Sequence, residues 1–203
     1  MNRTRTSAET AAYEHLERAM EHPTSLALQV RSRVHLYRGR YDDSLADATE
    51  AVRGDHNDAD ALTTLAEALI FTGEPEAALE PITKAQRLDP YNLSYHSFLR
   101  ALAAFGQGKF KDAVLLLEKA LELGPDEWSL ESGWRLYSPL YTLLVASYAY
   151  LERHEDAERV LAEIKTKWSN ANVATEMYYW LYKKQEDRDR LEEGLLLAGM
   201  RER

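Results

Sequence analysis

An internal repeat constrains the fold of this chain more than any other feature of the sequence. A turn signal, glycine followed two residues later by an aromatic residue or proline, begins at Gly39, Gly73 and Gly108, so that its copies are 34 and 35 residues apart. A fourth copy places Ala157 44 residues after Ala113. Periods of roughly 20–50 residues are typical of stacked repeat proteins, because one unit cannot bury its apolar face alone. The chain is therefore predicted to be a repeat array, with about ten residues inserted before its last unit.

Each unit is predicted to be a pair of antiparallel helices separated by that turn. Glycine is favoured where a helix ends in a left-handed residue. A small residue follows at Ala78, Ala113 and Ala157, where it lets the two helices approach closely. Proline after the second helix, at Pro90 and Pro125, prevents that helix from continuing. The predicted helices span residues 25–38, 41–54, 59–72, 75–88, 93–107, 110–123, 139–152 and 154–167.

With this period, turn, small residue and closing proline, residues 12–168 resemble the tetratricopeptide repeat family. The resemblance implies an all-α solenoid of about four helix-turn-helix repeats, in which the first helix of each pair lines a concave groove. Arg31 and His35 stand where the first repeat should place core residues, so its first helix is expected to be shifted or packed less tightly. We expect repeats at 25–58, 59–92, 93–127 and 138–168, with an insert at 128–137.

The beginning of the chain is expected to be an N-terminal half-repeat. Within residues 1–24, the stretch 12–23 is similar to the second helix of a repeat, and no first helix precedes it. This helix is therefore either a cap on the array, or the remainder of a longer array whose earlier part is missing.

The end of the chain, residues 169–203, is expected to form two capping helices, at 170–182 and 186–200. The stretch from Asp187 to Met200 resembles the tail of tetratricopeptide modules attached to bacterial class III nucleotide cyclases and related regulators. That resemblance implies a bacterial protein in a regulatory setting, and it implies no activity of this chain.

The composition excludes several classes of protein. Thirty-four acidic residues against 25 basic residues give a net charge of −9, so no concentrated basic face is expected for nucleic acid. No apolar run approaches the ~18 residues of a membrane span. Cysteine is absent, which fits a reducing compartment. We therefore expect a cytoplasmic protein with no membrane span and no nucleic-acid partner.

No arrangement of reactive residues predicts catalysis. The six histidines lack the spacing of a zinc-binding helix. The stretch Gly106-Gln-Gly108-Lys lacks the ending of a phosphate-binding loop, and no serine stands in a Gly-x-Ser-x-Gly elbow. We therefore expect a chain that is not an enzyme and that has no cofactor and no metal site.

A stripe of aromatic and polar residues along the first helices is the candidate site. Positions three and four apart share one face of a helix, and the resemblance implies that this face lines the groove. Large exposed apolar residues often mark an interaction surface. We expect Phe71 and Leu102 to be exposed there, whereas Tyr37, Ile70 and Phe105 either line the groove or pack between helices. The predicted groove residues are Gln29, Arg33, Tyr37, Thr63, Glu67, Phe71, Tyr95, Phe98, Leu102 and Tyr150.

The sequence thus favours a non-catalytic interaction module that binds a peptide or an amphipathic helix of another protein in the groove. The insert supplies Trp128 and Trp134, which either cover a widened joint between repeats or form a lid that contacts the partner. Two other functions stay open. A second copy could cover the half-repeat helix at 8–22 and give a homo-oligomer, or the chain could be the regulatory arm of a larger signalling protein.

Overall fold

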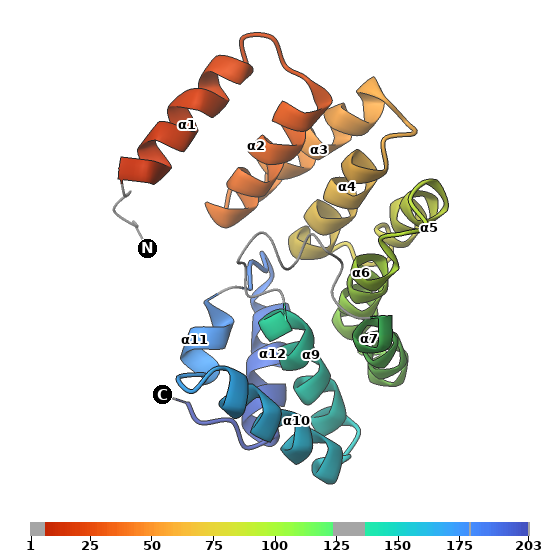
Figure 1. Cartoon of the computed structure of the whole chain (residues 1–203), viewed down its shortest axis with the longest axis vertical. Coiled ribbons are helices and arrows are strands. Elements are labelled where there is room, and N and C mark those ends of the chain that lie inside the picture. The colour runs from red at the N-terminus through yellow and green to blue at the C-terminus, as the bar shows by residue number, and fades with distance from the viewer. Residues whose placement is uncertain (1–6, 124–136, 179, 203) are drawn as a thin grey trace.

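The computed structural model of the chain describes residues 7–123, 137–178 and 180–202, and all the regular structure in these ranges is helical. Residues Trp128 and Trp134 lie outside the described residues. Figure 1 shows the helices following one another along a curved array. The all-α fold predicted from the repeat is therefore confirmed.

Four antiparallel helix pairs form the body of the array in the described part of the chain (Figure 1). One helix, α1, precedes the pairs, and two helices, α11 and α12, follow them. The pairs are α2 (Ser25–Tyr37) with α3 (Tyr41–Gly54), α4 (Ala59–Thr72) with α5 (Leu79–Leu88), α6 (Leu93–Gly106) with α7 (Phe110–Leu123), and α9 (Tyr137–Tyr150) with α10 (His154–Lys167). The flanking helices are α1 (Ser7–Ala19), α11 (Val173–Met177) and α12 (Gln185–Leu197).

The turns within the pairs have the geometry that the sequence predicts. Gly39, Gly73 and Gly108 all have positive φ angles, of 71°, 91° and 72°. The fourth pair places Glu152 at the same point of the turn, with a φ of 57°. Left-handed backbone strains a residue with a Cβ atom, so this turn is the least favourable of the four.

Helix α5 begins at Leu79, four residues later than predicted. The reason is Pro81, which is buried in its first turn. Proline has no N–H to bond the carbonyl four residues earlier, and its ring crowds that carbonyl. Residues 75–78 therefore form turns, and the helical bonds begin with Ile82 N–H donating to the Ala78 carbonyl over 3.2 Å.

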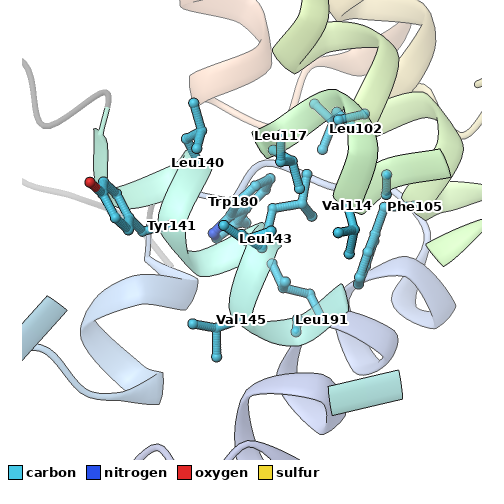
Figure 2. Close-up of a cluster of buried hydrophobic side chains, with 14 of the residues drawn as sticks. Leu102, Phe105, Val114, Leu117, Leu140, Tyr141, Leu143, Val145, Trp180 and Leu191 are labelled. Atoms are coloured by element: carbon cyan, nitrogen blue, oxygen red, sulfur yellow. The ribbon is translucent and has the colours of Figure 1, made fainter. Parts of the chain in front are cut away.

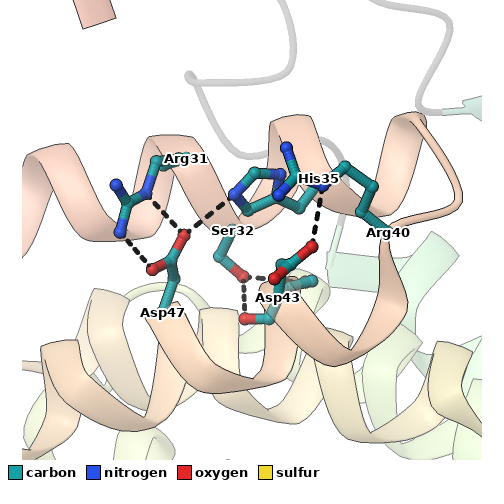
Figure 3. Close-up of polar contacts among 7 residues, drawn as sticks. Arg31, Ser32, His35, Arg40, Asp43 and Asp47 are labelled. Atoms are coloured by element: carbon teal, nitrogen blue, oxygen red, sulfur yellow. Dashed lines mark hydrogen bonds and ion pairs between the residues drawn. The ribbon is translucent and has the colours of Figure 1, made fainter. Parts of the chain in front are cut away.

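The interface within the first pair is polar, whereas the interfaces of the later pairs are apolar. Arg31 donates two hydrogen bonds, of 2.7 and 2.6 Å, to the Asp47 carboxylate, and His35 Nε2 lies 3.4 Å from the same group (Figure 3). Beside them, the buried Ser32 hydroxyl donates to the Ser44 carbonyl over 2.9 Å. Helix α2 occupies the predicted residues, so it is not shifted; ion pairs and hydrogen bonds replace the missing apolar contacts.

The C-terminal residues depart most from the sequence-based prediction. Instead of a helix over 170–182, the structure has only the five-residue α11. Helix α12 packs on α9, the first helix of the last pair. Figure 2 shows Trp180 and Leu191, from the C-terminal segment, among the core side chains Val114, Leu117 and Leu143. The C-terminal residues therefore join the core of the array, rather than only closing its end.

Candidate functional site: the inner face of the first helices

The first helices α2, α4 and α6 contact one another in series and define one side of the array, here called the inner face. Two polar contacts join them. Arg33 Nε of α2 donates to Glu67 Oε2 of α4 over 3.0 Å, and the Tyr95 hydroxyl of α6 donates to Glu67 Oε1. The Glu67 carboxylate thus links three consecutive first helices.

The surroundings of Arg33 and Tyr95 determine their protonation states. The negative charge of Glu67 raises the pKa of the Arg33 guanidinium above its usual value. Burial raises the pKa of the Tyr95 hydroxyl well above its usual value, and Glu67 adds to that rise. Arg33 is therefore charged and Tyr95 neutral throughout the physiological pH range. The three groups can orient one another and a ligand, but neither Arg33 nor Tyr95 changes its charge near pH 7, as a group that transfers protons would.

An apolar stripe on α2 is the most exposed part of the inner face. Leu26 is 68% exposed, Val30 is 41% exposed and Tyr37 is 42% exposed. Arg33 lies between Val30 and Tyr37 and carries the contact to α4. We call Leu26, Val30, Arg33 and Tyr37 the α2 stripe. It combines apolar surface with one cation, which is the composition of a typical protein-binding patch.

Several predicted groove residues are structural instead. Leu102 is fully buried, with 0% of its surface exposed, in the same core cluster as Phe105 and Leu117 (Figure 2). The prediction that it is exposed was wrong. Gln29 is buried and donates to Asp58 Oδ2 over 3.0 Å, and Thr63 is buried and donates to the Ala59 carbonyl over 2.8 Å. None of these three side chains is available to a partner.

The three residues that could either line the groove or pack between helices differ in exposure. Tyr37 is exposed, whereas Ile70 and Phe105 are buried and pack between helices. Tyr95 and Phe98 are half-buried, with stacked rings whose centroids are 6.2 Å apart. These two aromatic residues continue the α2 stripe across Glu67 toward α6.

The described residues show neither a metal-binding cluster nor a membrane-spanning helix. Within residues 7–123, 137–178 and 180–202, no three His, Asp or Glu side chains converge on a point that could hold a metal ion. In the same ranges no helix is both long and apolar enough to cross a membrane.

Comparison with known families agrees with the geometry. A tetratricopeptide repeat model matches residues 30–92 and 96–134, which together make up half of the chain. The chain belongs to the tetratricopeptide repeat family. Repeats of this family are generally protein–protein interaction modules. A comparison with curated proteins gives no match.

Solved structures of other tetratricopeptide repeat proteins are similar to this one. TTC0263, a thermophilic protein of Thermus thermophilus, has a TM-score of 0.65 at 20% identity and aligns over 92% of this chain and 90% of its own. MamA has a TM-score of 0.54 at 17% identity, over 82% of this chain and 91% of its own. The first such domain of human RPAP3 has a TM-score of 0.52 at 19% identity, over 66% of this chain and 97% of its own. At these identities the likeness concerns the fold alone.

In this tetratricopeptide repeat protein, the C-terminal segment covers two of the predicted groove residues. The Phe71 ring lies 5.3 Å from the Tyr182 ring, centroid to centroid. The Tyr150 hydroxyl donates to the Arg190 carbonyl over 2.7 Å, while its ring stacks on Phe110 at 4.2 Å. The inner face is therefore occupied toward its C-terminal end, and the α2 stripe lies at the other end.

The predicted groove residues omit Leu26 and Val30, which are exposed in the α2 stripe. The signal was present, because Leu26, Val30, Arg33 and Tyr37 follow one another at intervals of four, three and four residues. The repeat period favours Gln29 instead, since Thr63 follows it by 34 residues and Phe98 follows Thr63 by 35. On α2, Val30 is exposed and Gln29 is buried, so the exposed face of this helix differs from the one that the repeat period predicts.

Proposed function

We propose that this chain is a non-catalytic adaptor that binds a peptide or an amphipathic helix of another protein through the α2 stripe and the adjoining inner face. The observation that supports it most is the set of exposed apolar side chains Leu26, Val30 and Tyr37 around Arg33. Isolated exposed apolar residues are ordinary, but three within one helical stripe mark an interaction surface.

The chemistry of the stripe indicates the kind of ligand. An amphipathic helix or short apolar peptide would cover Leu26 and Val30 with its own apolar side chains. Arg33 already pairs with Glu67 and is 41% exposed, so a ligand carboxylate could share it at the rim. The expected ligand is therefore apolar along one face and carries an acidic residue near its middle.

The tail motif from Asp187 to Met200 supports a bacterial setting for this adaptor, through its resemblance to modules of bacterial regulators, and the absence of cysteine fits the cytoplasm. The same resemblance is the basis for a regulatory role, in which the ligand belongs to a signalling protein.

Affinity capture with matched baits tests the proposal. The baits are the unaltered chain, the double variant Leu26→Glu with Val30→Glu, and the control Leu115→Glu. Leu115 lies on α7 and is 66% exposed, so its substitution adds a charge at an equally open site on a different surface. We expect a partner that the unaltered chain and the control retain and the double variant loses, with unchanged helicity in all three.

The expected effect is large enough to measure on the purified partner. Losing two buried apolar contacts costs about 3 kcal/mol at a binding hot spot, which is roughly a 150-fold increase in Kd. Equal capture by all three baits would overturn the proposal. If light scattering shows a dimer that the double variant alone converts to a monomer, the stripe binds a second copy of this chain and not another protein.

A further inference from the structure

The segment between α11 and α12, residues 180–184, crosses from the last repeat to the turns of the first two repeats. We call it the strap. Its backbone pairs with the array: Lys183 N–H donates to the Phe71 carbonyl over 2.8 Å, and the Tyr41 hydroxyl donates to the Tyr182 carbonyl over 3.0 Å. Hydrogen bonds to the main chain, such as these two, are among the contacts by which binding domains hold extended peptides.

The strap lysines contact acceptors that belong to the array. Lys183 Nζ lies 2.7 Å from Asp42 Oδ1. Lys184 Nζ donates to the Gly73 carbonyl over 2.7 Å, just past the end of α4. The C-terminal end of a helix carries a partial negative charge, so a cation is favoured there. The turns thus offer one carboxylate and one helix end to two consecutive basic residues.

The shape of the array at this point fits the strap. A Cβ atom built on Gly73 would overlap the Lys184 side chain, so the glycine leaves the space that the lysine stem occupies. The Tyr182 ring packs against Phe71 at 5.3 Å and stacks on Trp180 at 5.7 Å. Aromatic packing, backbone pairing and two basic contacts therefore converge on one extended segment.

The strap also has a cost in its docked position. The Trp180 indole N–H and the Tyr182 hydroxyl are buried and have no hydrogen-bond partner among the described residues. Buried polar groups without partners lose their hydrogen bonds to water, and this loss opposes docking.

From these contacts we infer that the turns of the first two repeats form a binding site for an extended partner segment in which an aromatic residue precedes two basic residues. The site is formed by Tyr41, Asp42, Phe71 and Gly73. The strap fills it from within the same chain, and a partner segment of the same chemistry competes with the strap. This site is separate from the α2 stripe, so the failure of either proposal leaves the other standing.

Peptide binding to the full chain tests the site. The probe is a fluorescent peptide with the sequence of residues 180–186, Trp-Leu-Tyr-Lys-Lys-Gln-Glu. The protein is the strap variant, in which Tyr182, Lys183 and Lys184 are all replaced by serine. We expect saturable binding to the strap variant, at least tenfold tighter than to the unaltered chain, whose site is already filled. A peptide with both lysines replaced by glutamate should bind at least tenfold more weakly.

Charge reversal on the array provides matched controls. Asp42→Lys, added to the strap variant, should weaken peptide binding at least fivefold. Asp112→Lys, the same change in the first turn of α7, should leave it unchanged. The proposal is overturned if a strap variant of normal helicity does not bind the peptide, or binds the glutamate peptide equally well.

Hydrogen exchange and the oligomeric state test the proposal if the strap variant does not fold or if the chain forms a dimer. If the strap variant does not fold, hydrogen exchange of the unaltered chain replaces it: excess peptide should speed exchange at the Lys183 amide, and unchanged exchange overturns the competition. If the unaltered chain is a dimer in solution and the strap variant a monomer, the occupant is the strap of a second copy, and occupation within one chain is overturned.

Discussion

Helix α12 rests on α9 through a glycine, and replacing Gly194 by alanine tests whether that close contact holds the C-terminal residues in place. A Cβ atom at Gly194 would lie 2.8 Å from the Ala146 Cβ, 3.1 Å from the Ala146 Cα and 3.0 Å from Tyr150 Cε2. Ordinary contacts between carbon atoms are about 3.5–4.0 Å. One of these neighbours is backbone, so the two helices must move apart.

Two opposing effects set the size of the change. Overpacking of this kind costs about 1–3 kcal/mol. Alanine favours a helix interior over glycine by about 1 kcal/mol. The net expectation for Gly194→Ala is therefore a loss of stability between about 0 and 2 kcal/mol.

The control is Gly54→Ala, at the last residue of α3. A Cβ atom there meets no atom within 4 Å, so only the propensity gain remains, up to about 1 kcal/mol. The two variants should differ by up to about 3 kcal/mol in free energy of unfolding, with Gly194→Ala the less stable. Urea denaturation followed by circular dichroism measures this difference. If Gly194→Ala is as stable as Gly54→Ala, the contact between α12 and α9 is looser than we infer.

Two further predictions concern the turn of the last pair and the polar interface of the first. Glu152→Gly relieves a left-handed residue and should raise the stability by about 0.5–1 kcal/mol, measured as a higher urea midpoint; an unchanged or lower midpoint would contradict it. Burial lowers the pKa of His35, with Arg40 adding to that effect while Asp47 and Asp43 oppose it. Because the unfolded chain binds the proton more readily, stability should fall as the pH drops below about 6.5. His35→Gln should flatten that part of the pH profile, and an unchanged slope would assign the dependence to other groups.

The repeat made most of the helices predictable, because each boundary is set by residues close to it. Gly39, Gly73 and Gly108 end their helices through their own backbone conformation, whatever the rest of the chain does. The late start of α5 is equally local, and Pro81 is the signal for it in the sequence. The helix start at residue 75 was predicted from the period of the other repeats, without regard to Pro81.

Exposure was less predictable than helix position, because it depends on residues far away in the sequence. Leu102 occupies a position that the stacking of first helices alone would leave on the inner face. It is buried in a core cluster that residues far away in the sequence also join, including Trp180 and Leu191. No pattern in the sequence near Leu102 indicates that it is buried. The apolar residues within 180–200 can be recognised in the sequence, but the sequence does not indicate which helices they contact.

The residues of the tail motif, Asp187 to Met200, hold α12 against the array. Arg190 is held by Asp187 at 2.9 Å and donates to the Gly106 carbonyl at the end of α6 over 2.8 Å. Gly194 permits the contact with α9, and Gly199 ends the segment with a φ of 83°. From the sequence these residues stood out by resemblance only; in the structure they hold α12 against the array.

The strap changes how the array should come apart. In a simple solenoid each repeat contacts only its neighbours, so the ends can fray one unit at a time. Here the hydrogen bond from Tyr41 to Tyr182 joins residues 141 positions apart. Such a contact closes a long loop and has to form late, since the entropy of closure opposes it until the intervening repeats are in place. Once formed, it ties the first repeat to the last, so neither end can open without breaking the tie. The array should therefore unfold more nearly as one cooperative unit than a linear stack of the same four repeats would.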